Sequence, residues 1–244
     1  KSLQKALEIL NLFTEKPVLG VTEVSEYFGL YKSTVHNILS TLKAMEYLEQ
    51  DEETGKYRLG IQIFNLSKAL GDTYSITKIA GPYMQELSNY TGERCYLAVP
   101  YRQEVLYLDA MYPADSIELM RSILGERAQM HCTGLGKAML ANMGEREISD
   151  YLEHHKLEAF TENSIIDKKQ FREELLRTKQ RGYALDDMEH EFGIKCIAMP
   201  VFDRTKNVYA AISISGMANH FTDANIAEWA MLLKKYIRKI ESRL

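Results

Sequence analysis

The sequence predicts an α+β protein of two domains, and three observations support this class. The first sixty residues combine three short helical patterns with two short strand patterns. The rest of the chain mixes helical patterns with strands that follow one another closely, such as 194–203 and 208–216, which is typical of an antiparallel sheet flanked by helices. A chain of 244 residues, 45% of them hydrophobic, has enough apolar side chains for two cores.

The first two helices are short. The first has one apolar stripe at helical spacing: Leu3, Leu7, Leu10 and Phe13. In the second, Thr22 can cap the N-terminus, Val24 and Phe28 face the core, and Gly29 ends the helix.

The third helix spans about residues 32–45 and is followed by a hairpin. Five apolar side chains are expected on its buried face: Val35, Ile38, Leu39, Leu42 and Met45. Residues 47–50 and 56–59 resemble two strands around a turn at 51–55. This order of elements predicts a winged helix-turn-helix within residues 1–60.

The exposed face of the third helix suits DNA. Helix amides with the Ser33 and Thr34 hydroxyls can hold a phosphate, and Lys32, His36 and Asn37 can reach base edges in the major groove. Two further cations, Lys56 and Arg58, lie where a wing would meet the DNA backbone. The alternative is a winged helix used for protein contacts, because acidic side chains outnumber basic ones over residues 1–75. A dimer is expected, since one such module contacts few phosphates.

Residues 61–75 continue a helical pattern and predict a linker helix, so the second domain spans 76–244. This domain has five helical patterns, at 76–90, 136–142, 145–155, 168–181 and from 222 to the end. Four strand patterns lie between them, at 95–102, 104–112, 194–203 and 208–216.

Four interpretations of the stretch His131–Leu140, HCTGLGKAML, are compared: a phosphate loop, a thiol enzyme, a zinc site and an anion site made of main-chain amides. A phosphate loop is excluded, because Lys137 is followed by alanine and the first glycine is missing. A thiol enzyme would use Cys132 or Cys196 as nucleophile, and a zinc site would have to draw ligands from distant segments. In the fourth interpretation, the main-chain amides at the start of the helix bind a small carboxylate. A glycine turn that only allows close packing fits the residues equally well.

Composition narrows the setting. The formal charge of −4 predicts no general attraction to nucleic acid or to an acidic membrane, so DNA binding must come from a local surface. No apolar run is long enough to span a bilayer, and the first residues do not form a secretion signal. Three scattered cysteines favour a reducing, cytoplasmic location, and we expect no cofactor and no resident metal.

Several blocks resemble the IclR-type bacterial transcription regulators, in the same order over essentially the whole chain. They are ALEILNLF, the block from VTEVSEYFGL to KYRLG, HCTGLGKAMLA, RGYALDDMEHEFGIKCIAMPVFD and AAISISG. The resemblance implies a winged helix, a linker helix and a GAF-like (profilin-like) effector domain. It also implies a regulator without catalysis, which binds operator DNA as a homodimer or a dimer of dimers and responds to a small organic acid or sugar acid.

By position, the resemblance implies an effector site. Its amides are those of Gly134 and Leu135, and the other residues are Met120, Asp186, Cys196, Ser213 and Ser215. A carboxylate such as Asp186 beside an acid ligand could accept a hydrogen bond from a ligand hydroxyl. Two positions depart from the family pattern. Asn37 replaces a common arginine, and Tyr31 replaces a frequent proline at the start of the third helix.

Overall fold

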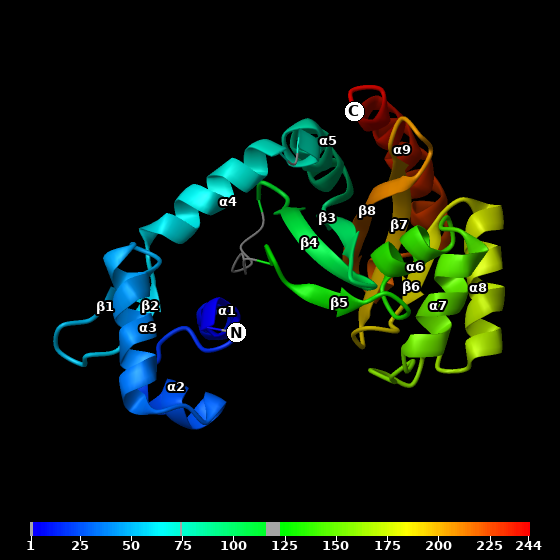
Figure 1. The fold of residues 1–244 in the computed structure, drawn as a ribbon. Coiled ribbons are helices and arrows are strands. Elements are labelled where there is room, and N and C mark those ends of the chain that lie inside the picture. The colour runs from blue at the N-terminus through cyan, green and yellow to red at the C-terminus, as the bar shows by residue number, and fades with distance from the viewer. Residues whose placement is uncertain (1, 74, 116–122) are drawn as a thin grey trace. The chain divides into compact units, whose positions relative to one another are not determined.

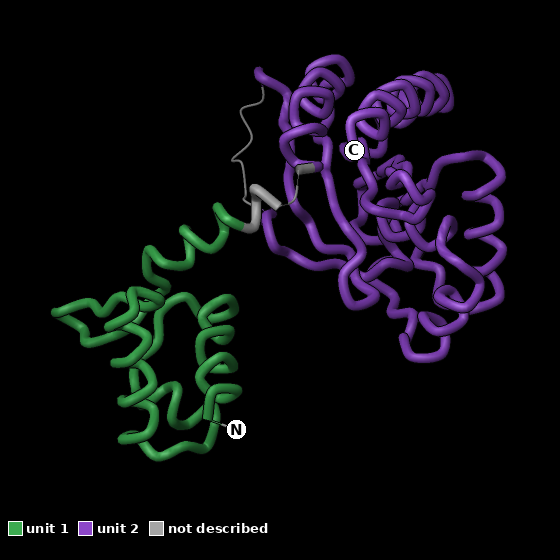
Figure 2. The backbone as a smooth tube through the Cα atoms, turned by 45° about the horizontal axis from the view of Figure 1, so that its top comes forward, with its two compact units in different colours: residues 1–74 green, residues 75–244 purple. Residues whose placement is uncertain are grey.

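The chain divides into two compact units, Lys1–Tyr74 and Ser75–Leu244, each with its own core (Figure 2). A computed structural model describes residues 2–73, 75–115 and 123–244.

The first unit is a winged helix-turn-helix, as the sequence predicts (Figure 1). Its elements are α1 (Ser2–Leu12), α2 (Val21–Phe28), α3 (Lys32–Ala44), β1 (Leu48–Gln50), β2 (Tyr57–Leu59) and α4 (Ile61–Thr73). The two strands are antiparallel, with Leu48 opposite Leu59, and Leu19 forms an isolated bridge to Tyr57.

The core of this unit corrects the expected stripe of α1. Leu3 and Leu7 are exposed, whereas Ile9, Leu12 and Phe13 are buried against Val24, Val35 and Leu39. The helix carries apolar residues on more than one face, and spacing alone does not identify the face that packs on α2 and α3. Met45 is also exposed, because α3 ends at Ala44 and Met45 is its C-cap.

The predicted N-cap of α2 is wrong, whereas the residue predicted to end the helix is right. Gly20, not Thr22, is the N-cap, and its amide donates to the carboxylate of Glu23 in the first turn. A carboxylate three residues into the helix therefore replaces the hydroxyl cap. Gly29 ends the helix with a φ of 62°, in the left-handed region that glycine adopts without strain.

The second unit contains one six-stranded sheet with helices on both faces (Figure 1). Its strands are β3 (Arg94–Tyr101), β4 (Glu104–Met111), β5 (Arg127–Gln129), β6 (Ala184–Asp187), β7 (Ile194–Phe202) and β8 (Val208–Met217). Its helices are α5 (Ser75–Thr91), α6 (Gly134–Leu140), α7 (Glu145–His154), α8 (Lys168–Arg181), α9 (Asp223–Glu241) and the 3₁₀ turn Ala218–His220. The sheet order is β5-β4-β3-β8-β7-β6, and every neighbouring pair is antiparallel.

Each face of this sheet has its own apolar cluster. On one face α5 and α9 cover Leu97, Met199 and Ile212, and on the other α6, α7 and α8 cover Ala98 and Ala211. The central strands are buried on both faces, so β8 has a nearly continuous run of buried residues. The predicted α+β class and antiparallel sheet are confirmed, whereas two short strands, β5 and β6, were not predicted.

Candidate functional site

Pairing within the sheet places polar residues from four strands in one row. Asp186 of β6 is opposite Cys196 of β7, Cys196 is opposite Ser215 of β8, and Ser215 is opposite Arg94 of β3. Directly opposite residues share a face of the sheet. The next row on this face includes Ser213, which is opposite Tyr96. Segments far apart in the sequence thus form one polar surface.

The turn before α6 lies against this surface. The Thr133 hydroxyl is the N-cap: it accepts a hydrogen bond from the Gly136 amide (3.1 Å) and donates one to the Gln129 carbonyl (3.0 Å). Gly134 is so close to Cys196 that a Cβ on it would lie 2.5 Å from the Sγ atom. Glycine at this position therefore lets the first turn of α6 lie against β7 without displacing the Cys196 thiol.

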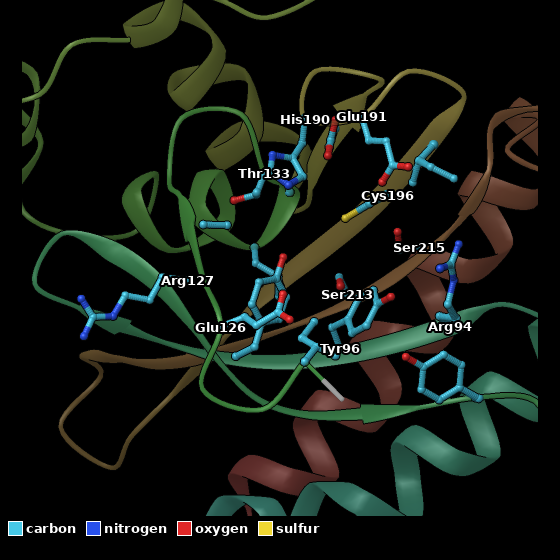
Figure 3. A pocket seen from close by; sticks show the side chains of 18 residues that line it. Arg94, Tyr96, Glu126, Arg127, Thr133, His190, Glu191, Cys196, Ser213 and Ser215 are labelled. Carbon is cyan, nitrogen blue, oxygen red and sulfur yellow. The ribbon is translucent and has the colours of Figure 1, made fainter. Parts of the chain in front are cut away.

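A cavity of about 300 Å³ lies between the polar rows and this turn (Figure 3). Six of the predicted effector residues line it: Gly134, Leu135, Asp186, Cys196, Ser213 and Ser215. The seventh, Met120, lies outside the described residues. The structure thus brings the six together, and their contact with a ligand stays a prediction.

Other lining residues were not predicted from the sequence. They include Arg94, Tyr96, Tyr107, Tyr112, Glu126, Arg127, His190 and Glu191. Figure 3 shows Cys196, Ser213 and Ser215 among the labelled polar side chains, with His190 and Glu191 on the neighbouring loop. For Arg94 and Tyr96 a signal exists, because alternate residues of a strand share a face. This alternation shows which residues of β3 share a face. Which of the two faces borders the cavity is known only once the pairing of β3 with β8 is known.

The loop after β6 carries two of these side chains, His190 and Glu191. Met188 has a φ of 59°, which is uncommon for a residue with a Cβ. Two hydroxyls hold the loop: Thr161 donates to the Met188 carbonyl and Ser164 to the Glu189 carbonyl, each at 2.6 Å. The loop is therefore fastened to the segment before α8.

Beneath the cavity lies a buried charged group. The Lys137 side chain of α6 is completely buried and forms an ion pair with Glu189, which is also buried. The amide of Glu189 donates to a carboxylate oxygen of Asp186 at 2.8 Å. Burial raises the pKa of Asp186 to about 7, with Lys137 and the amide hydrogen bonds opposing this effect. A deeply buried lysine is rarely tolerated unless it is paired.

His131 and Cys132 do not form a catalytic pair with each other. His131 is buried, with Nε2 2.9 Å from the Glu158 carbonyl and Nδ1 3.4 Å from the Tyr151 hydroxyl. Cys132 instead faces His190, with Sγ 3.5 Å from Nδ1. Burial raises the pKa of Cys132 to about 12 and lowers that of His190, so the reactive thiolate form is disfavoured.

The cysteines and histidines do not assemble into a metal centre in the part of the chain that the structure describes. There, no three histidine, cysteine or carboxylate side chains lie close enough together to hold an ion. Nor, within the same residues, is any helix long and apolar enough to cross a membrane.

The predicted DNA-contacting side chains of α3 all lie at the surface. These are Lys32, Ser33, Thr34, His36 and Asn37. The helix begins at Lys32 with Tyr31 as its N-cap, and no side chain caps its first amides. An uncapped helix N-terminus offers N–H donors to a phosphate.

The two predicted wing cations have acidic partners. Lys56 pairs with Glu23 at 2.9 Å and Arg58 with Glu49 at 3.1 Å, both in exposed positions. Exposed ion pairs of this kind are weak, so a phosphate can replace the carboxylate. The pairing nevertheless reduces the positive charge that this wing presents.

A winged helix-turn-helix joined to a second α+β unit with a polar cavity is typical of bacterial transcriptional regulators. Residues 2–52 match the IclR helix-turn-helix domain, and residues 68–242 match the family described as bacterial transcriptional regulator IclR C-terminal. The chain belongs to the IclR family of transcriptional regulators.

Relatives match over nearly their whole length. The HTH-type transcriptional regulator XynR of Escherichia coli K12 is 33% identical, covering 96% of this chain and 93% of that protein. KdgR of the same organism is 31% identical, and the match covers 100% of this chain and 92% of that protein. The Thermotoga maritima IclR crystal structure superimposes with a TM-score of 0.80 at 29% identity, covering 99% of this chain and 98% of that one.

A fourth comparison concerns the fold alone. The crystal structure of an IclR homolog from Microbacterium hydrocarbonoxydans, complexed with 4-hydroxybenzoate, has a TM-score of 0.87 at 20% identity, covering 99% of this chain and 98% of that one.

Proposed function

We propose that the chain is a regulator whose binding to double-stranded operator DNA is controlled by a small organic acid or sugar acid. Residues 1–60 bind the DNA, 61–75 form the connecting helix, and 76–244 bind the effector. The protein holds this ligand without transforming it.

The observation that carries this proposal is the convergence of polar groups on one cavity of the second unit. Asp186, Cys196 and Ser215 come from three paired strands, and the turn at Gly134 closes the cavity above them. The Ser213 hydroxyl is buried beside the Cys196 sulfur, which is its only hydrogen-bond partner in the described residues. Sulfur is a weak hydrogen-bond partner, so a ligand oxygen would satisfy this buried hydroxyl better. A cavity of this volume can enclose a small organic molecule.

The amides of the α6 turn add a complementary donor. The Gly136 amide bonds to Thr133, and the Gly134 backbone hydrogen-bonds to the Cys196 sulfur. The Leu135 amide, which also belongs to the first helical turn, has no intrahelical partner and is the natural donor to a carboxylate. The Microbacterium homolog, which shares this fold, was crystallised in complex with an acid, 4-hydroxybenzoate.

The exposed, uncapped start of α3 supports DNA binding through Lys32, Ser33, Thr34, His36 and Asn37, with Lys56 and Arg58 contacting the backbone from the wing. We also propose that the chain acts as a homodimer or a dimer of dimers. One unit offers few cations, and two half-sites are needed for strong specific binding.

The first prediction is that an acid of two to six carbons raises the melting temperature of the second unit and changes affinity for DNA. A ligand that binds only the native state stabilises it. The emission of Trp229, the single tryptophan, reports on the second unit. DNA affinity is measured on duplexes that the protein selects from a random library, at fixed salt.

Variants make this experiment specific. Ser213→Ala should weaken ligand binding by about two- to tenfold, because it removes one hydrogen bond. The matched control is Ser242→Ala, outside the cavity. Cys132→Ala should keep both DNA binding and response to the ligand. Thiol-dependent turnover that this variant lacks, or no stabilisation by any acid, would contradict the proposal.

A further inference from the structure

Two buried carboxyl groups share one buried ammonium beneath the cavity. Lys137 pairs directly with Glu189, while Asp186 has no ion-pair partner among the described residues. Glu174, the next acid near Lys137, is already paired with Arg177 at 3.0 Å and with Arg181 at 2.7 Å. If Glu189 and Asp186 were both ionised, the region would carry an uncompensated negative charge away from water. Such a charge is normally removed by protonation.

We propose that Asp186 meets the effector as a neutral carboxylic acid, so that an anionic ligand binds together with one proton above neutral pH. This inference rests on the proposed function, because it concerns the same cavity. It changes the role first expected for Asp186: instead of only accepting a bond from a ligand hydroxyl, the side chain donates its O–H to a ligand oxygen.

Geometry assigns the proton to Asp186 and not to Glu189. Burial raises the pKa of Glu189 as well, but the Lys137 ammonium in direct contact with Glu189 opposes this effect, and Asp186 has no such contact. Asp186 lines the cavity, and the amides of Glu189 and His190 both donate to its carboxyl group, which still leaves capacity for a hydrogen bond to a bound molecule. One oxygen of Asp186 accepts the Glu189 amide at 2.8 Å, which fixes the carboxyl group in place.

Burial is the largest effect on Asp186, and it opposes ionisation. It outweighs the amide hydrogen bonds and the more distant charge of Lys137, and the pKa rises to about 7. The Glu189 charge also raises it. The groups that face Asp186 are Lys137 of α6, Glu189 and His190 of the following loop, Cys196 of β7, Tyr107 of β4 and Cys132. Of these, only Lys137 is a permanent cation, since burial lowers the pKa of His190.

The protonation state determines which ligands fit. A second carboxylate beside an ionised Asp186 would be repelled, whereas a neutral acid donates to a carboxylate, keto or hydroxyl oxygen. At pH 8 the free protein holds Asp186 mostly ionised, so an anionic ligand must bring a proton from solvent. Its apparent affinity should then fall by about tenfold for each pH unit above the midpoint.

The protonation itself is tested without ligand. Protein labelled with ¹³C at aspartate side-chain carboxyls is titrated from pH 5 to 9, and Asp186 is assigned by through-bond correlation and by loss of its signal in Asp186→Asn. Its signal should move with a midpoint near 7, while that of Asp203, whose pKa its hydrogen bonds lower, stays constant. A midpoint near 4, the ordinary aspartate value, would overturn the proposal.

Proton uptake on binding is tested by calorimetry with pyruvate and D-gluconate as probes. At pH 8, the binding enthalpy in phosphate and in Tris should differ by the amount that corresponds to about one proton taken up per ligand. At pH 5.5, where Tris does not buffer, the comparison is made in acetate and MES, and the two binding enthalpies should agree. Asp186→Asn should lose the pH dependence of binding, whereas the exposed control Asp223→Asn should keep it.

The outcomes separate the two proposals. Binding of either probe without proton uptake at pH 8 overturns the role of Asp186 and leaves the proposed function standing. If no acid in the screen binds, the proposed function fails, and the carboxyl titration alone decides the protonation state of Asp186.

Discussion

Gly134 and Gly136 in the first turn of α6 are required for different reasons. A Cβ at Gly134 would meet the Cys196 thiol, which can rotate away, whereas one at Gly136 would lie 2.3 Å from both Cα and O of Met130. Backbone atoms cannot move aside as a thiol can. Both glycines therefore allow α6 to pack closely against its neighbours. Of the two, Gly134 also lines the cavity.

Gly136→Ala should lower the free energy of unfolding of the second unit by about 1–3 kcal/mol, the usual cost of overpacking. This reverses the small gain that alanine normally brings within a helix. Gly134→Ala should cost less, and Cys196→Ala added to it should restore part of the loss. Urea unfolding followed by Trp229 emission measures all three, and an unchanged midpoint for Gly136→Ala would contradict the packing.

Lys137→Met should destabilise the second unit by about 3–5 kcal/mol, because it leaves Glu189 buried without its cation. Adding Glu189→Gln should recover part of the loss, since it removes the orphaned charge. The same unfolding measurement applies, with the exposed Lys179→Met as control. Equal effects for Lys137 and Lys179 would show that the ion pair contributes nothing to stability.

Among the elements, α3 carries the prediction about DNA. Lys32→Ala combined with Thr34→Ala should weaken binding to a selected duplex by more than tenfold at fixed salt, through loss of a cation and a hydroxyl near the helix N-terminus. Loss of the Lys32 contact should also reduce the salt dependence of binding. Unchanged affinity in a folded variant would exclude this end of α3 as the recognition surface.

Secondary-structure elements with clear end signals were predictable. α8 has the predicted bounds, because Asp167 caps it and Gly182 ends it with a φ of 83°. β5 has three residues and β6 has four, and neither has an alternation long enough to detect, so both were missed. The cap of α2 was misplaced because the sequence offered a hydroxyl at Thr22, whereas the chain uses the Glu23 carboxylate.

The candidate site was predictable only in part. The resemblance indicated Asp186, Cys196, Ser213 and Ser215, which the structure places around one cavity. Arg94 and the contact of Cys132 with His190 depend on strand register and on loop placement, which single-chain periodicity does not contain. The pairing of Lys137 with Glu189 was also hidden, because a lysine in a sequence is normally interpreted as exposed.

For the whole molecule, regulation requires that the effector and DNA influence each other's binding. If an acid changes the affinity for a selected duplex by some factor, saturating duplex must change the affinity for that acid by the same factor. Calorimetry with and without duplex measures one factor, and titration of DNA with and without acid measures the other. Unequal factors would show that an additional equilibrium, such as a change of assembly, takes part.

The strand order of the second unit also affects how the chain is made. β3 lies in the middle of the sheet, yet one of its two partners is β8, so that Leu97 pairs with Ile212 near the end of the chain. During translation β3 and β4 leave the ribosome long before β8 exists, whereas the first unit needs only contacts among its own residues. The first unit can therefore fold early, while the sheet must wait for almost the entire chain. Newly made β3 therefore keeps an unpaired edge until β8 has been synthesised.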